Sequence, residues 1–320
     1  MAEALHQLSY DPCASRVFCG RPPAELRRLA DWVCDRDPYG ELPSLRAALR
    51  LVDPGNDDPR AHIGHQLWCA WRQASWTAGT ARPLPAVVTS GRHWLDETRG
   101  RPTVLVTPMT MTTADALHTF AAVFADRPVV AFGEGAVRRY GAGLSVANGD
   151  AGSIRDILGH LAAGGVLGTY ADFVYDGRGA ESTTLFGRPR PLSSGFVAAA
   201  SRPGTMLLPA SMRPLGGERI AVEFDEPLLV QGTPRQTRVA REGMRRLIAR
   251  LMEGLIRRNP QQWLLLPTLT FDCPQLAQVR PDPVETAAAA AVPFTEADAK
   301  PPYHHRASGF PYFPADPIRR

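Results

Sequence analysis

The pattern of apolar and polar positions along the chain changes character near residue 85. Upstream, apolar residues recur three or four positions apart, which predicts an amphipathic helix over 23–33 and two more helices between 44 and 80, split by a turn cluster at 53–59. Downstream, short apolar runs alternate with amphipathic stretches. Strands are predicted at 85–90, 102–108, 127–133, 166–172, 205–212 and 218–225. Helices are predicted between them at 92–100, 113–126, 152–165 and 196–200.

Strands that alternate with helices predict an α/β fold with a largely parallel central sheet flanked by helices. The segment 173–195 is expected to be a loop. The clearest helix is predicted over 236–258, where residues three or four apart form one apolar stripe. Arginines crowd the rest of its surface, which we interpret as a solvated face, the alternative being a surface for an acidic partner or an anionic substrate. These arginines are Arg238, Arg241, Arg245, Arg246, Arg250, Arg257 and Arg258.

Three regions follow from this pattern. Residues 1–43 form an N-terminal helical extension, and residues 44–268 form the α/β domain. Residues 269–320 form a linker and tail rich in proline and alanine, because low-complexity sequence and many prolines do not build a packed core.

Composition narrows the classes of function. The chain has 36 Lys and Arg against 32 Asp and Glu, a net charge of +4, which gives no argument for nucleic-acid binding. The five cysteines show no CxxC spacing, so we expect reduced thiols and no zinc site. Neither a signal peptide nor a membrane span is recognisable, so a cytoplasmic location is expected. The motif Gly133-Glu134-Gly135 lacks the third glycine of a dinucleotide fingerprint, and no cofactor is expected.

The predicted helix before residue 80 carries His62, His65 and Trp68 on one face. Two histidines at this spacing suit a metal or a substrate. We favour an aromatic face packed on the core, because no third ligand is near in the sequence.

The segment VLVTPMTMTTAD at 104–115 resembles the site of the lipid A late acyltransferases. In that family a histidine stands five positions before an acidic residue, as a general base that the carboxylate orients. Asp115 takes the acidic position here, and Thr110 stands where the family has its histidine. Since a threonine does not titrate near neutral pH, it cannot replace that base.

Other stretches are similar to the same family and extend the resemblance over about residues 44–267. They are LRAALRLVDPGNDD at 45–58, LAAGGVLGTYAD at 161–172, the long segment 185–228 that begins with LFGR, and NPQQWLLLP at 259–267. The resemblance implies an acyltransferase-like α/β fold. It also implies a change of reaction, because the family's base, membrane helix and late basic cluster are missing.

Three functions fit these observations. The first is a biosynthetic enzyme of specialised metabolism with altered chemistry, such as amine substitution or cyclisation, on a small or carrier-protein-tethered substrate. Relatives use acyl carrier proteins, so the resemblance implies an acidic carrier protein as partner. The second is an acyltransferase using acyl-carrier-protein or acyl-CoA donors, with His118 or His93 as a displaced base. The third is a non-catalytic subunit that supports a partner enzyme.

The candidate residues divide into two groups. Those proposed for catalysis are Thr110, Asp115, His118 and Asp172. Those proposed to bind substrate are Arg92, His93, Thr112, Thr113, Arg188 and Arg190. Threonine hydroxyls would hydrogen-bond the substrate, Asp115 or Asp172 would accept a proton, and Arg188 or Arg190 would hold an anionic group. For His118, a structural contact with Asp115 is the favoured interpretation.

Overall fold

The computed structural model describes residues 23–38, 40–132, 139–140, 144–147, 151–172, 180–216, 218–231 and 238–270. The start of the N-terminal extension, the Gly133-Glu134-Gly135 motif and nearly all of the predicted tail lie outside these residues.

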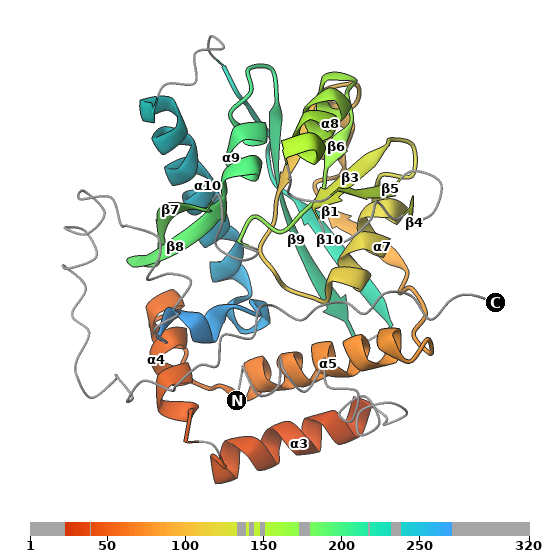
Figure 1. Cartoon of the computed structure of the whole chain (residues 1–320). Coiled ribbons are helices and arrows are strands. Elements are labelled where there is room, and N and C mark those ends of the chain that lie inside the picture. The colour runs from red at the N-terminus through yellow and green to blue at the C-terminus, as the bar shows by residue number, and fades with distance from the viewer. Residues whose placement is uncertain are drawn as a thin grey trace.

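The described residues build one large, mainly parallel sheet with helices on both faces (Figure 1), which confirms the predicted sheet class. Parallel pairs are β1 with β10, β9 with β2, β2 with β6, β6 with β3, and β3 with β5. The strands, in their order across the sheet, are β1 (Ala86–Ser90), β10 (Arg219–Phe224), β9 (Met206–Leu215), β2 (Thr103–Val106), β6 (Val166–Leu167), β3 (Val129–Phe132), β5 (Leu144–Ala147) and β4 (Arg139–Tyr140), and β11 (Leu228–Leu229) pairs with β9.

Alternation along the strands divides the core into two layers. Val104 of β2 and Leu207 of β9 face one layer, while their neighbours Leu105 and Leu208 face the other. All four side chains are fully buried, as expected for strands covered on both faces. The helices α8 (Ala151–Ala162), α9 (Ser194–Ala200) and α10 (Arg238–Arg258) contribute to the first layer, and α6 (Arg92–Glu97) and α7 (Thr113–Val123) contribute to the second.

The N-terminal helices confirm the pattern upstream of residue 85. They are α3 (Pro23–Arg36), α4 (Leu42–Val52) and α5 (Arg60–Thr77). The outermost of them, α3, packs along α5 (Figure 1) and buries Leu26, Ala30 and Val33 in the first layer. The polar residues of α5 are buried as well, among them both histidines and Arg72.

The prediction of a loop at 173–195 is wrong over the second half of that segment. Residues Ala180–Leu185 (β7) and Arg188–Ser193 (β8) form an antiparallel hairpin. Its two-residue turn has positive φ at Phe186 (51°) and at Gly187 (73°), the geometry that matches the twist of paired strands. Pro189 and Pro191 in β8 obscure the strand in the sequence, although a two-stranded ribbon tolerates proline because its outer edge needs no N–H donors.

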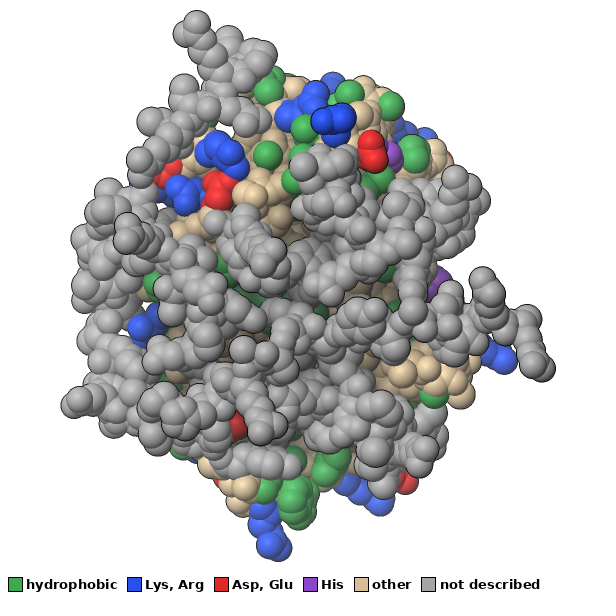
Figure 2. All heavy atoms as spheres, viewed as in Figure 1, with side chains coloured by type: hydrophobic (Ala, Val, Ile, Leu, Met, Phe, Trp, Pro, Cys, Tyr) green, Lys and Arg blue, Asp and Glu red, His purple; other side chains and the backbone are tan. Residues whose placement is uncertain are grey.

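The basic face of α10 is largely paired with the protein's own carboxylates. Arg241 and Arg245 contact Glu181 of β7, Arg246 contacts Glu242, Arg257 contacts Glu253, and Arg258 contacts Asp225. On the face in Figure 2, basic and acidic side chains lie interspersed where they are visible. The pairing supports a solvated, ion-paired face, since an acidic partner would have to compete with these carboxylates.

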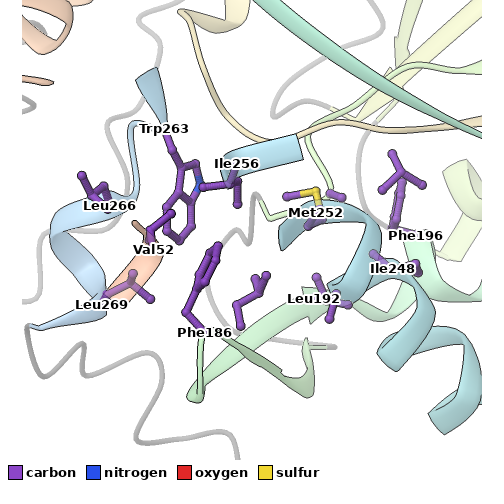
Figure 3. Close-up of a cluster of buried hydrophobic side chains, with 14 of the residues drawn as sticks. Val52, Phe186, Leu192, Phe196, Ile248, Met252, Ile256, Trp263, Leu266 and Leu269 are labelled. Carbon is purple, nitrogen blue, oxygen red and sulfur yellow. The ribbon is translucent and has the colours of Figure 1, made fainter. Parts of the chain in front are cut away.

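After α10 the chain turns through two short 3-10 helices, η1 (Pro260–Gln262) and η2 (Leu266–Leu269). Trp263 between them is fully buried in the first layer, near Phe186, Ile256, Leu266 and other apolar residues (Figure 3). No helix within the described ranges combines the length and the apolar composition needed to cross a bilayer.

Candidate functional site

The carboxyl ends of β2 and β6 define the candidate site. These adjacent strands are parallel, but the chain leaves them toward opposite faces, through α7 after β2 and through the hairpin and α9 after β6. Such a switch in direction is where open α/β sheets bind ligands. Thr110, Thr112 and Asp115 follow β2, and Asp172 follows β6, so the fold brings both groups of predicted residues to this edge.

Thr112 and Asp115 form the start of α7. The Thr112 hydroxyl accepts a hydrogen bond from the Asp115 backbone N–H (3.1 Å) and donates to its Oδ2 (2.8 Å). This reciprocal cap satisfies an N–H that the first turn of the helix leaves open. It fixes the carboxylate of Asp115 toward α5.

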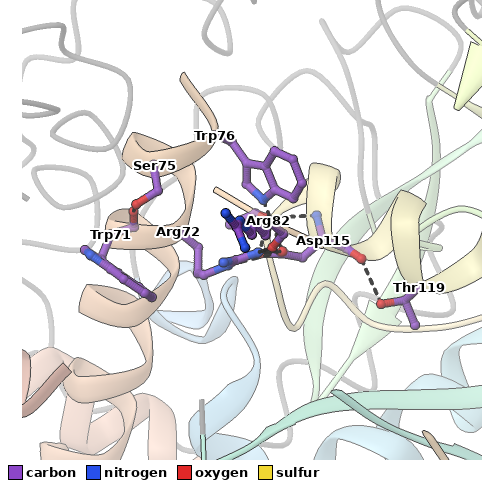
Figure 4. Close-up of polar contacts among 8 residues, drawn as sticks. Trp71, Arg72, Ser75, Trp76, Arg82, Asp115 and Thr119 are labelled. Atoms are coloured by element: carbon purple, nitrogen blue, oxygen red, sulfur yellow. Dashed lines mark hydrogen bonds and ion pairs between the residues drawn. The ribbon is translucent and has the colours of Figure 1, made fainter. Parts of the chain in front are cut away.

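On α5, Arg72 and Trp76 hold the Asp115 carboxylate (Figure 4). Arg72 Nε donates to both carboxylate oxygens, at 3.0 and 3.2 Å, and Nη2 of the same side chain pairs with Oδ1. Trp76 Nε1 donates at 3.1 Å, and Arg72 also donates to the Arg82 carbonyl. The Arg72 and Asp115 side chains are 4% and 0% exposed. Because all of these donors hold its carboxylate, Asp115 links α5 to α7 and has a structural role.

Thr110 anchors the segment between β2 and α7. Its hydroxyl donates to the Met212 carbonyl of β9 (2.8 Å), and its own carbonyl lies 2.6 Å from His65 Nε2. Because a carbonyl only accepts, His65 carries its proton on Nε2. Both side chains are buried, so Thr110 is engaged in the packing of α5 and β9 around the segment.

The two histidines of α5 belong to this packing. His62 Nδ1 lies 3.0 Å from the Gln261 carbonyl, and burial lowers the pKa of His62 to about 3 and that of His65 to about 4. Both rings are therefore neutral at physiological pH. In the part of the chain that the structure describes, no three His, Cys, Asp or Glu side chains gather as metal ligands would. These contacts favour the core interpretation of this face.

His118 lies one turn beyond Asp115 on α7 and stacks on Trp76, with ring centres 4.9 Å apart and planes 10° from parallel. Burial lowers the pKa of His118; the nearby Asp115 charge raises it and the Arg72 charge lowers it. The imidazole is thus neutral near pH 7. It adjoins the Arg72–Asp115 pair through the indole of Trp76.

Asp172 forms a second polar cluster on the other side of the β2–α7 segment. The Met109 backbone N–H lies 3.0 and 3.2 Å from its two oxygens, and Trp263 Nε1 donates to Oδ2 at 2.6 Å. Burial raises the pKa of Asp172 to about 6, although the donors Trp263 and Met109 and the charge of Arg190 act to lower it. The Arg190 guanidinium carbon lies 5.8 Å from the Trp263 ring centre. The fold thus sets a carboxylate that titrates near neutral pH beside a buried arginine.

The remaining predicted residues lie at different distances from the two clusters. Arg188 and Arg190 stand two positions apart on β8, so both project from the same side of the hairpin. Thr113 is the first residue of α7 and is partly exposed. Arg92 and His93 are exposed at the start of α6, and β9 and β10 separate their strand, β1, from β2. The structure therefore does not bring Arg92 and His93 into either cluster.

Sequence reasoning missed four partners in these clusters: Arg72, Trp76, Met109 and Trp263. A signal for Arg72 does exist. His65, Trp68, Arg72 and Trp76 recur three or four apart, so the arginine shares a face with buried rings. A buried cation there requires a carboxylate partner.

No protein-family model matches the chain, and no curated protein matches it.

Proposed function

We propose that the chain is a biosynthetic enzyme on an acyltransferase-like scaffold, which acts on a small or carrier-protein-tethered substrate at the carboxyl ends of β2 and β6. The reaction class is amine substitution or cyclisation. The observation that carries the proposal is Asp172, a buried carboxylate whose pKa is raised to about 6 beside Arg190. A base with a pKa just below the working pH is deprotonated yet still accepts protons efficiently.

In the proposed step, an amine nitrogen of the substrate attacks an electrophilic carbon. The new C–N bond forms as the bond to the leaving group breaks, and the leaving group departs with the electron pair. Asp172 accepts the proton that the nitrogen loses. Arg190, with Arg188 on the same side of β8, holds the anionic leaving group or a substrate carboxylate. Thr113, the partly exposed first residue of α7, would hydrogen-bond the substrate.

The Asp115 cluster supports this site without taking the proton. Its carboxylate is committed to Arg72, Trp76 and Thr112, and Thr110 is bonded to β9. An amine nucleophile needs no strong base when the site aligns it with the reacting carbon. The proposal therefore accommodates the loss of the histidine that an alcohol acceptor would require.

The proposal is tested by turnover of Asp172→Asn. Purified protein is incubated with a carrier protein loaded with an amino-acyl thioester, and separately with an acyl-CoA and an amine, and the products are detected by mass spectrometry. Removing the proton acceptor is expected to lower turnover by about 10²- to 10⁴-fold. Asp225→Asn, which alters an exposed ion pair with Arg258, is the matched control and should keep full turnover. Equal turnover in wild type and Asp172→Asn would contradict the proposal.

One observation favours acyl transfer with a displaced base as a second candidate. His118 is neutral near pH 7 because burial lowers its pKa, and it stacks beside the Arg72–Asp115 pair. Under this alternative His118→Ala abolishes transfer from acyl-CoA or an acyl carrier protein to a hydroxyl acceptor. Under the first proposal His118→Ala leaves the amine reaction within about threefold of wild type, since that variant keeps Asp172.

A further inference from the structure

Trp263 contacts both charged groups of the Asp172 cluster with different parts of one side chain. Its indole N–H donates to Asp172 Oδ2 at 2.6 Å. Its ring face lies 5.8 Å from the Arg190 guanidinium carbon, within the range of a cation–π contact. Phe186 packs on the same indole with ring centres 5.9 Å apart, and Trp263 is fully buried. The indole therefore has a fixed orientation between the carboxylate and the guanidinium.

The backbone beside Trp263 closes a hydrogen-bonded circuit around the end of β2. Leu264 N–H donates to the Met109 carbonyl at 2.8 Å, and Met109 N–H donates to Asp172. Asp172 in turn accepts from Trp263, the neighbour of Leu264. In this circuit Met109 lies 63 positions from Asp172 in the sequence, and Trp263 lies 91 positions from it. Moving Trp263 would thus move the proton acceptor and the β2–α7 segment together.

We propose that Trp263 is a positioning residue that holds Asp172 ionised and oriented toward the substrate and holds Arg190 beside it. This inference rests on the proposed role of Asp172. Trp263 itself takes no proton and touches no reacting atom. A residue that only filled the core would leave the ionisation of Asp172 unchanged when its N–H is removed.

The physical effect of the indole N–H follows from its charged partner. A hydrogen bond to a carboxylate stabilises the ionised form, so its loss raises the pKa of that carboxyl. The other charged and titratable groups that interact with Asp172 are Arg190 of β8, whose charge lowers its pKa, and Tyr170, whose hydroxyl donates to the Met111 carbonyl. Trp263→Phe keeps an aromatic ring near Arg190 and removes the N–H. We expect it to raise the pKa of Asp172 by about 1 to 2.

The first test needs no substrate. The pH dependence of unfolding is measured for Trp263→Phe and for Trp263→Phe with Asp172→Asn, and the difference isolates the titration of Asp172. For wild type relative to Asp172→Asn, the free energy of unfolding should fall as the pH rises and should level off at about pH 6, where the folded carboxyl titrates. In the Trp263→Phe background the change should extend to about pH 7 to 8. A stability change that still ends near pH 6 in the Trp263→Phe background would overturn the inference.

Trp68→Phe is the matched control, because Trp68 is buried and its Nε1 has no hydrogen-bond partner among the described residues. It removes an indole with no bond to Asp172, so the upper end of the stability change should stay near pH 6. Equal shifts in both tryptophan variants would also overturn the inference. If Trp263→Phe does not fold, a benzothienyl analogue of tryptophan at this position keeps the volume and removes the N–H.

Turnover gives the second readout. Trp263→Phe should lose about two- to tenfold at pH 7, where between half and most of Asp172 becomes protonated, and should recover most of that loss at pH 9. A loss that persists at pH 9 would show a packing role only and would overturn the positioning role. If Asp172→Asn keeps full turnover while Trp263→Phe still extends the stability change to higher pH, the proposed function fails but the contact between Trp263 and Asp172 stands.

Discussion

The buried pair of Arg72 and Asp115 provides the sharpest stability prediction. Arg72→Met removes the donor that reaches both carboxylate oxygens and leaves a carboxylate that is 0% exposed with the neutral donors Trp76 and Thr112. Breaking a buried pair on one side costs about 3–5 kcal/mol, because one charge stays buried without compensation. Asp115→Leu is expected to cost a similar amount, since Arg72 then loses its carboxylate and keeps the Arg82 carbonyl and the rings of Trp71 and Trp76 as neutral partners.

The double variant distinguishes a coupled pair from two independent contacts. In Arg72→Met with Asp115→Leu both charges are gone, and the remaining cost is about 1–2 kcal/mol for the unmatched Trp76 N–H and the changed packing. The assay is urea unfolding followed by circular dichroism at pH 7, with unchanged m-values as the check on two-state behaviour. Single variants that cost less than about 1 kcal/mol each, or whose costs simply add in the double variant, would show that Arg72 and Asp115 are not a coupled buried pair.

Three further outcomes follow from individual contacts. Thr110→Val should lose about 1–2 kcal/mol in thermal unfolding, because it leaves a β9 carbonyl without its donor, whereas Thr110→Ser keeps the bond. Gly91→Ala should cost more than Gly100→Ala: both have positive φ, but only at Gly91 would a Cβ meet a backbone oxygen, that of Phe224, at 2.0 Å. The folded pKa of Asp172 is raised from 3.8 to about 6, so its stabilising contribution is complete below about pH 4 and is lost as pH rises to 6. The stability of wild type relative to Asp172→Asn should therefore fall by about 3 kcal/mol over that window in pH-dependent urea unfolding.

The local part of the fold could be predicted from the sequence, because it depends on spacing. The apolar stripe of α10 is visible as a period of 3.6, and the buried strands β9 and β10 are visible as short apolar runs. The cap between Thr112 and Asp115 is also local, since three positions separate the two residues. The β7–β8 hairpin was not predicted, because Pro189 and Pro191 are unusual in a strand, although Phe186-Gly187 forms its turn.

The partners within the site could not be predicted, because they come from distant segments. Arg72 reaches Asp115 across 43 positions, and Trp263 reaches Asp172 across 91. Spacing along the chain says nothing of such pairs until the order of strands is known. The same order also explains why Arg92 and His93, which follow a strand as Thr110 does, lie apart from it: their strand is separated from β2 by two others.

The proposed reaction depends on ionised Asp172. Its most direct test is the pH dependence of turnover in the wild-type protein, with Asp172→Asn as the reference. Turnover should fall on the acidic side with an apparent pKa of about 6, and the residual rate of Asp172→Asn should lack that limb. An acidic limb that persists in Asp172→Asn, or that disappears in His118→Ala instead, would contradict the account.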